Sequence, residues 1–145
     1  MEKRCTENDK RFLRQAWKSK EDTDGLSQVE FRSFQVAALV VNPENRVVGE
    51  GLSKWPPGKH WIGKEEYNDF VDQAEIDAID QRDFPGCTLY TTRCPNEESA
   101  RHIVRTRLDR VLYVEENHLF KSGLPLLESA KVEVVRVPNL LPEVP

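Results

Sequence analysis

The sequence is poor in the residues that hold small secreted domains together or bind transition metals. Its 145 residues include only three cysteines and three histidines. Cys5, Cys87 and Cys94 are too few for a disulfide framework, and one of them would stay unpaired. No apolar run approaches the roughly 20 residues of a membrane span, and no apolar stretch typical of a secretory signal follows the charged N-terminal residues. We therefore expect a cytoplasmic protein in a reducing compartment, without a membrane segment.

An excess of basic charge is also lacking. The chain has 21 Lys and Arg against 25 Asp and Glu, a net charge of −4, whereas proteins that grip nucleic acid normally present a basic face. The one local exception is RHIVRTRLDR, residues 101–110, with four arginines. Glu97 stands four residues before Arg101, the favourable order for an ion pair on a helix. We interpret this face as solvated, and the charge argues against nucleic acid as a partner.

The length and the 38% apolar content are typical of one globular domain with a full hydrophobic core. The sequence has no internal repeat. We expect a single domain over residues 1–145, with its core at about 10–137. The tail at 138–145 is punctuated by prolines and is expected to be ordered only if something holds it.

Hydrophobic periodicity predicts the helices. Phe12, Leu13, Ala16 and Trp17 form one apolar stripe, which indicates a helix over residues 10–20. Further helices are predicted from about residue 73, over 97–106 and over 123–130. In the helix over 97–106, the side chains of Ala100, Ile103 and Val104 are expected to face inward.

Short apolar and β-branched runs predict five strands, at 34–41, 46–52, 87–92, 109–116 and 131–137. The first two are joined by the turn sequence NPEN and form a predicted hairpin. Strands and helices alternate in the second half, which implies parallel pairing with helices on both faces. The sequence therefore predicts an α/β fold, a three-layer α/β/α sandwich around a five-stranded mixed sheet.

Two short segments at predicted helix starts carry the functional signal. They are QAE at residues 73–75 and PNEES at residues 95–99. These segments resemble the His-Ala-Glu and Pro-Cys-x-x-Cys motifs of the zinc-dependent cytidine and deoxycytidylate deaminases. Around the second segment the resemblance runs without a gap over residues 88–113.

The resemblance extends to most of the chain. VVGEGLSKWPPG, residues 47–58, is similar to a substrate loop of the deoxycytidylate branch, and Ser53 falls where that family has a substrate-binding asparagine. The similarity spans about residues 34–137 and implies the cytidine deaminase-like fold, in agreement with the fold predicted from the strand and helix pattern.

All three positions that bind zinc in the family carry other residues here. Gln73 stands for the histidine, and Asn96 and Ser99 stand for the two cysteines. Zinc in such sites is held by imidazole nitrogen and thiolate sulfur, and amide or hydroxyl groups supply neither the softness nor the charge. Glu75 matches the proton-shuttling glutamate, but one carboxylate without a metal cannot activate water enough for deamination. Glu75 would be catalytic only if the protein is active.

A rebuilt metal site finds little support. Using Cys94 as the first ligand breaks the ungapped fit and puts Glu97 where the second thiolate belongs. Cys87 lies a strand-length away, and the histidines have no ligand spacing to one another. We expect no zinc and no other cofactor. An active deoxycytidylate or cytidine deaminase-type hydrolase with a rebuilt metal site stays the alternative.

Helix capping explains the same residues without any ligand. Asn96 precedes two acidic residues and is a good N-cap. Asp72 and Glu75 form the pattern of a capping box. Both helix starts therefore have a purely structural interpretation.

The remaining functional hypothesis is a polar crevice between the two helix starts, which suits an anionic or polar ligand. The residues expected to line it are Ser53, Trp55, Gln73, Glu75, Asn96 and Ser99. Trp55 could stack on a base, or it could simply pack in its loop. The sequence favours a zinc-free, non-catalytic protein of the deaminase fold that binds a pyrimidine nucleotide or acts as a regulatory or scaffold subunit. The protein partners we expect are further copies of this chain, in a homo-oligomer, or an active deaminase.

Overall fold

The computed structural model describes residues 5–22, 36–52, 78–79, 83–116 and 121–138. The predictions for the substrate-like loop after residue 52, for the helix start near residue 73 and for the tail beyond residue 138 lie outside these residues. So do four of the six expected crevice residues, namely Ser53, Trp55, Gln73 and Glu75.

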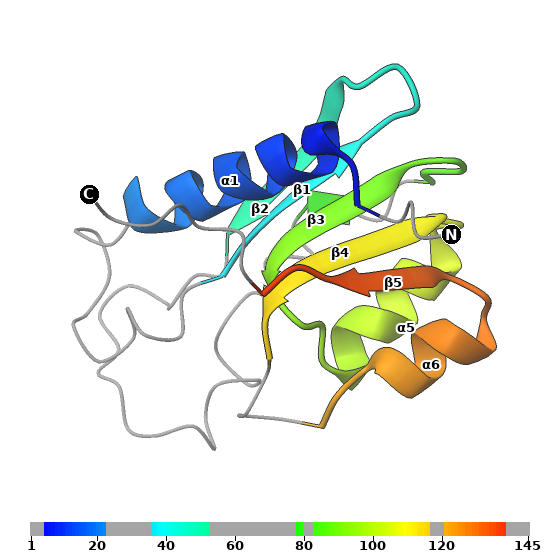
Figure 1. Cartoon of the computed structure of the whole chain (residues 1–145). Helices are drawn as coiled ribbons and strands as arrows, with labels where there is room; N and C mark the ends of the chain where they lie inside the picture. Colours follow the sequence, from blue (N-terminus) through cyan, green and yellow to red (C-terminus); the bar gives the residue numbers. More distant parts are fainter. Residues whose placement is uncertain (1–4, 23–35, 53–77, 80–82, 117–120, 139–145) are drawn as a thin grey trace, which may run out of the picture.

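A five-stranded mixed sheet forms the centre of the molecule (Figure 1). Its strands are β1 (Ala37–Val41), β2 (Val47–Leu52), β3 (Thr88–Arg93), β4 (Arg110–Glu115) and β5 (Glu133–Arg136). They lie in the order β2-β1-β3-β4-β5. β1 runs antiparallel to β2 and β3, whereas β3, β4 and β5 are parallel. The predicted hairpin and the predicted parallel half are both confirmed.

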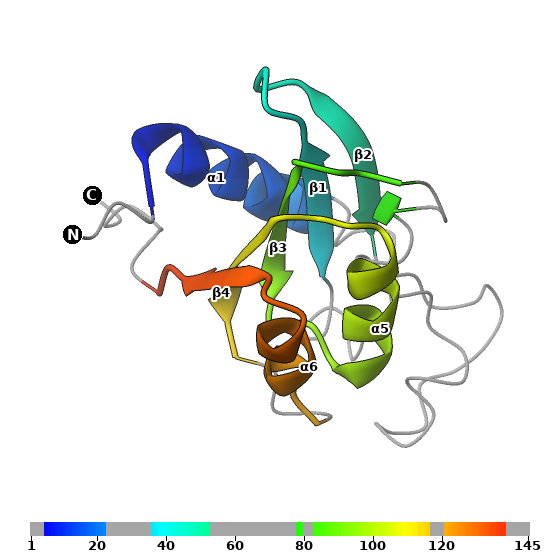
Figure 2. The ribbon, with the colours of Figure 1, turned by 90° about the vertical axis from the view of Figure 1, so that its right-hand side faces the viewer.

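Helices cover both faces of this sheet. α1 (Glu7–Asp22) lies on one face, and α5 (Glu97–Arg105) and α6 (Leu124–Ser129) lie on the other (Figure 2). The three-layer α/β/α prediction is therefore confirmed. None of the helices in the described ranges is long and apolar enough to cross a membrane.

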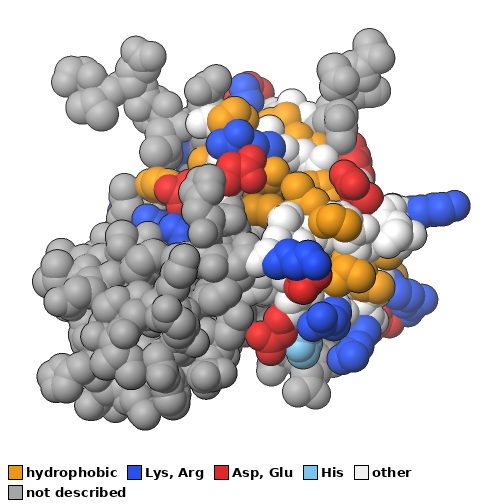
Figure 3. Space-filling view, turned by 90° about the horizontal axis from the view of Figure 1, so that it is seen from below, with side chains coloured by type: hydrophobic (Ala, Val, Ile, Leu, Met, Phe, Trp, Pro, Cys, Tyr) orange, Lys and Arg blue, Asp and Glu red, His pale blue; other side chains and the backbone are white. Residues whose placement is uncertain are grey.

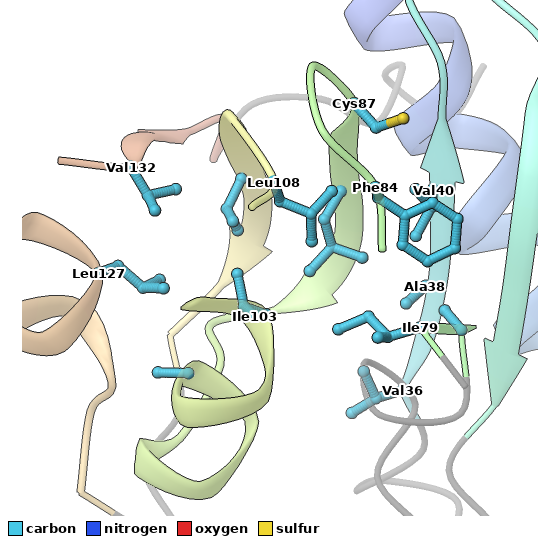
Figure 4. Packing of buried hydrophobic residues seen from close by; sticks show 14 residues of the cluster. Val36, Ala38, Val40, Ile79, Phe84, Cys87, Ile103, Leu108, Leu127 and Val132 are labelled. Carbon is cyan, nitrogen blue, oxygen red and sulfur yellow. The ribbon is translucent and has the colours of Figure 1, made fainter. Parts of the chain in front are cut away.

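Each face of the sheet has its own hydrophobic cluster. On the α1 face, Phe12, Leu13 and Ala16 are buried against the sheet, as their spacing predicts. On the opposite face, Ile103 of α5 and Leu127 of α6 have no exposed surface and belong to the cluster of Figure 4. Because every strand contributes alternate residues to the two clusters, both faces of the sheet are buried.

Glycine permits one close contact in this packing. A Cβ atom added at Gly49 in β2 would lie 2.4 Å from the carbonyl oxygen of Ala78. That distance is shorter than any ordinary nonbonded contact, so the short helical piece at 78–79 can approach β2 only because residue 49 has no side chain.

The prediction for Val104 is wrong. Ser99, Ala100 and Ile103 form the buried side of α5, and the side chain of Val104 is 37% exposed. With about 100° between successive residues, Ser99, Ala100 and Ile103 lie on the same side of the helix as the N-cap. Val104 lies next to this side but outside it. The short polar Ser99 hid this register in the sequence.

Candidate functional site

The start of α5 lies at the carboxyl edge of the parallel strands, where ligands bind in many open α/β sheets. Arg93 ends β3 and Glu115 ends β4, and their side chains form an ion pair at 3.5 Å. Directly after Arg93, the backbone N–H of Cys94 donates to the carbonyl oxygen of Glu115 at 2.8 Å. These contacts fix the direction in which the chain leaves the sheet and enters α5.

Asn96 is the N-cap of α5. Its backbone is extended, and its side-chain oxygen accepts a 2.9 Å hydrogen bond from the backbone N–H of Ser99. Glu97 and Glu98 supply negative charge in the first turn, where it interacts favourably with the helix dipole. The capping role predicted for Asn96 is confirmed.

Both residues of this cap are deeply buried. Asn96 is 4% exposed and Ser99 is 0% exposed. A side chain without accessible surface can touch a bound molecule only after a rearrangement of its surroundings. The ligand-contact role expected for these two residues stays a prediction, whereas their structural role is directly visible.

A segment that sequence reasoning missed packs against this helix start. Ser122 pairs with Asn96 in an isolated antiparallel bridge, and the N–H of Gly123 donates to the carbonyl oxygen of Pro95 at 2.9 Å. The side chain of Lys121 forms a 3.5 Å ion pair with Glu97. The only signal in the sequence is the glycine at the start of the predicted helix over 123–130, which does not say where the segment docks.

The ion pair with Lys121 replaces the ion pair that we expected between Glu97 and an arginine of α5. Glu97 contacts Lys121 rather than the Arg101 expected from helical spacing. Arg101 and Arg105 are exposed, as the solvated-face interpretation requires. Seen from below, the described surface carries basic and acidic side chains next to one another (Figure 3).

Cys94 is the one thiol close to the cap. It is 2% exposed, and its Sγ lies 3.6 Å from the carbonyl oxygen of Pro95 and 3.8 Å from the Ser122 hydroxyl. Within the described ranges, no group of three His, Cys, Asp or Glu side chains is placed to hold a metal ion.

The donors at this helix start do not fit zinc. The Asn96 oxygen already accepts the Ser99 N–H, and neither an amide nor an alcohol brings the negative charge that two thiolates would supply. A zinc ion here would have one sulfur neighbour at most in the described part of the site, Cys94.

One further titratable group lies near this thiol. Burial and the proximity of Cys94 raise the pKa of the Tyr113 hydroxyl to about 12. Tyr113 is therefore protonated and neutral at physiological pH.

Comparison with known proteins supports the resemblance seen in the sequence. No protein-family model matches the chain. It is 29% identical to mouse deoxycytidylate deaminase over an alignment 99 residues long, and the match covers 59% of this chain and 56% of the mouse protein. It is 27% identical to a probable deoxycytidylate deaminase of Drosophila melanogaster over an alignment 124 residues long, and the match covers 70% of this chain and 61% of the fly protein. The matched region thus spans little more than half the length of these relatives.

Solved structures agree over nearly the whole chain. The dCMP deaminase of cyanophage S-TIM5 in complex with dCMP and dUMP superposes with a TM-score of 0.71 at 20% identity, covering 94% of this chain and 99% of that one. The chain has the deaminase fold. A tRNA:A34 deaminase shares it with a TM-score of 0.60 at 20% identity, covering 88% and 97% of the two chains. In this deaminase-fold protein, Asn96 and Ser99 occupy the helix start that the sequence resemblance aligned with the cysteine motif.

Proposed function

We propose that this deaminase-fold protein is zinc-free and non-catalytic and that it binds a pyrimidine deoxynucleotide at the carboxyl edge of its sheet. The observation that carries the proposal is the state of Asn96, whose carboxamide oxygen is used as a helix cap where the resembling motif has a thiolate. The similarity to deoxycytidylate deaminases supplies the ligand class. A cap of this kind stabilises the helix start and leaves no anionic donor for a metal.

The ligand contacts are proposed on the residues that the sequence resemblance assigns. Ser53, Gln73 and Glu75 offer hydroxyl, amide and carboxylate groups that can hydrogen-bond a base edge or a sugar. Trp55 offers a ring for stacking. Backbone N–H groups at a helix start favour the phosphate.

Calorimetric titration with dCMP and dUMP tests the binding. We expect at least one of the two nucleotides to bind, and Trp55→Ala to weaken that binding by about tenfold, since base–aromatic stacking contributes about 1–3 kcal/mol. Trp17→Ala is the matched control, because it removes the same ring from α1, which lies on the face of the sheet away from α5. Absence of binding by both nucleotides would contradict the proposal.

Elemental analysis and an ammonia-release assay with dCMP test the absence of catalysis. We expect less than stoichiometric zinc in the purified protein and no ammonia above the background. One zinc per chain, together with turnover that Glu75→Ala abolishes, would instead establish the alternative, an active deaminase-type hydrolase with a rebuilt site.

A further inference from the structure

The chain on either side of Gly123 is pressed against the first turn of α5. We call residues 121–124 the strap. It contacts the helix start through the Asn96–Ser122 bridge, the hydrogen bond from the Gly123 N–H to Pro95 and the ion pair between Lys121 and Glu97. Three contacts of different kinds therefore join two segments that are more than twenty residues apart in the sequence.

Gly123 shows how tight this contact is. A Cβ atom at this position would lie 2.5 Å from the carbonyl oxygen of Asn96 and 2.6 Å from the Cβ of Ala100. Both neighbours belong to the start of α5, and the oxygen is a backbone atom that cannot rotate away. The strap can therefore reach the helix only because residue 123 is a glycine.

The strap also continues directly into the next helix. The backbone N–H of Leu124 donates to the Ser122 hydroxyl at 3.1 Å, and the N–H of Leu127 donates to the carbonyl oxygen of Gly123 at 3.1 Å. The first turns of α5 and α6 are thus held against each other through the strap. Movement of one helix start would disturb the other.

The structure points to a metal-free clasp, made of the Asn96 cap and the strap, that fixes the first turn of α5 in place of a bound metal ion. In the motif that this segment resembles, zinc ties two residues of this turn to a second helix. Here the Asn96 side chain satisfies the Ser99 N–H, and the strap closes over the turn. Asn96 and Ser99 are then positioning residues, which act through the placement of α5.

Hydrogen exchange of the ligand-free chain tests the clasp. We expect slow exchange at the Ser99 amide that does not change when a chelator is added. Asn96→Ala should accelerate exchange at Ser99 about fivefold, because a lost N-cap costs about 1 kcal/mol. Asn96→Asp should restore protection, since aspartate caps as well as asparagine. Gly123→Ala should accelerate exchange in the first turns of both α5 and α6.

Asn42→Ala is the matched control. The Asn42 side-chain oxygen accepts backbone N–H groups from Glu44 and Arg46 in the turn between β1 and β2. The same amide is removed there, yet exchange at Ser99 should keep its wild-type rate. Any difference between the two variants is then local to α5.

Two results would overturn the clasp. One is faster exchange at Ser99 after chelation of the wild-type protein, which would show that a metal holds the turn. The other is an unchanged Ser99 rate in a folded Asn96→Ala protein. The chelation experiment uses only the wild type, so the clasp can be overturned even if a variant does not fold. Because no nucleotide is present, failure of the nucleotide proposal would leave these results unaffected.

Discussion

The hydroxyl of Tyr90 in β3 donates a 2.5 Å hydrogen bond to the carboxylate of Asp9 near the start of α1. The same carboxylate accepts hydrogen bonds from the Arg110 guanidinium at 3.0 Å and from the Thr6 backbone N–H at 2.9 Å. Asp9 is only 3% exposed. These bonds tie α1 to the sheet at the edge where β4 begins, whereas the clasp lies at the edge where β4 ends.

Asp9→Asn should lower the free energy of unfolding by about 2 kcal/mol at neutral pH, because it removes a buried charged partner from Arg110, whose guanidinium keeps its ion pair with Glu133. Urea unfolding measures this change. Asp83→Asn is the control, since Asp83 pairs with Arg107 on the surface and the same substitution there should change the stability little. Equal effects of the two substitutions would show that the burial of Asp9 adds nothing.

The stability should also depend on the pH through Asp9. Burial opposes ionisation of this carboxyl, but hydrogen bonds from Arg110, Tyr90 and Thr6 outweigh it, and its pKa lies below the ordinary value. The stabilisation that a lowered pKa provides is present above the pKa of the unfolded state, about 3.9, and is lost as the pH falls through the pKa of the folded state. We expect the free energy of unfolding to decrease as the pH is lowered below about 5. The part of this pH dependence that comes from Asp9 should be absent in Asp9→Asn.

Tyr90→Phe should cost about 1–2 kcal/mol of stability, because it removes one donor from a buried carboxylate. The ring itself is retained, with its packing against Phe12 at a centroid distance of 5.4 Å. Tyr113→Phe is the matched control on the other face of the sheet, since the Tyr113 hydroxyl makes no hydrogen bond within the described part of the chain. Chemical unfolding should rank Tyr90→Phe as clearly the more destabilising of the two.

Gly49→Ala should destabilise the protein by about 2 kcal/mol. The new methyl group would collide with the carbonyl oxygen of Ala78, and either β2 or the chain at 78–79 must then move. Glu50→Ala, at the exposed neighbouring position, should be nearly neutral by thermal unfolding. A neutral Gly49→Ala would indicate that the two segments are not in contact.

Introducing the ligands of the motif that the sequence resembles should create a zinc site. The triple variant Gln73→His, Asn96→Cys, Ser99→Cys supplies one imidazole and two thiolates, and we expect about one zinc per chain by elemental analysis. Chelation should then destabilise this variant, because metal binding becomes part of its folding free energy, while the wild type should be indifferent. If the triple variant gains no zinc, the alignment of Gln73, Asn96 and Ser99 with the zinc ligands of the motif is wrong.

Much of the fold follows from local patterns. The stripe of Phe12, Leu13 and Ala16 predicted α1, which begins three residues earlier than expected, at Glu7. The β-branched runs predicted all five strands and their mixed pairing. The inward placement of Val104 failed, because a hydrophobicity pattern cannot anticipate that a buried serine defines the inner face of α5.

The candidate site also has one part that local sequence predicts and one part that it does not. The cap at Asn96 was predictable, since an N-cap depends on a few neighbouring residues. Docking of the strap was not predictable, because the contact between Gly123 and Asn96 depends on how β4 and α6 pack in the folded protein.

Local sequence patterns predict where strands and helices form, which residue caps α5 and which family the motifs resemble, because propensity, periodicity and capping act over a few residues along the chain. No local pattern predicts the contact of Tyr90 with Asp9, 81 residues away in the sequence, or the docking of the strap on α5. Such contacts depend on how the layers pack, and buried polar groups must find their partners wherever that packing brings them together.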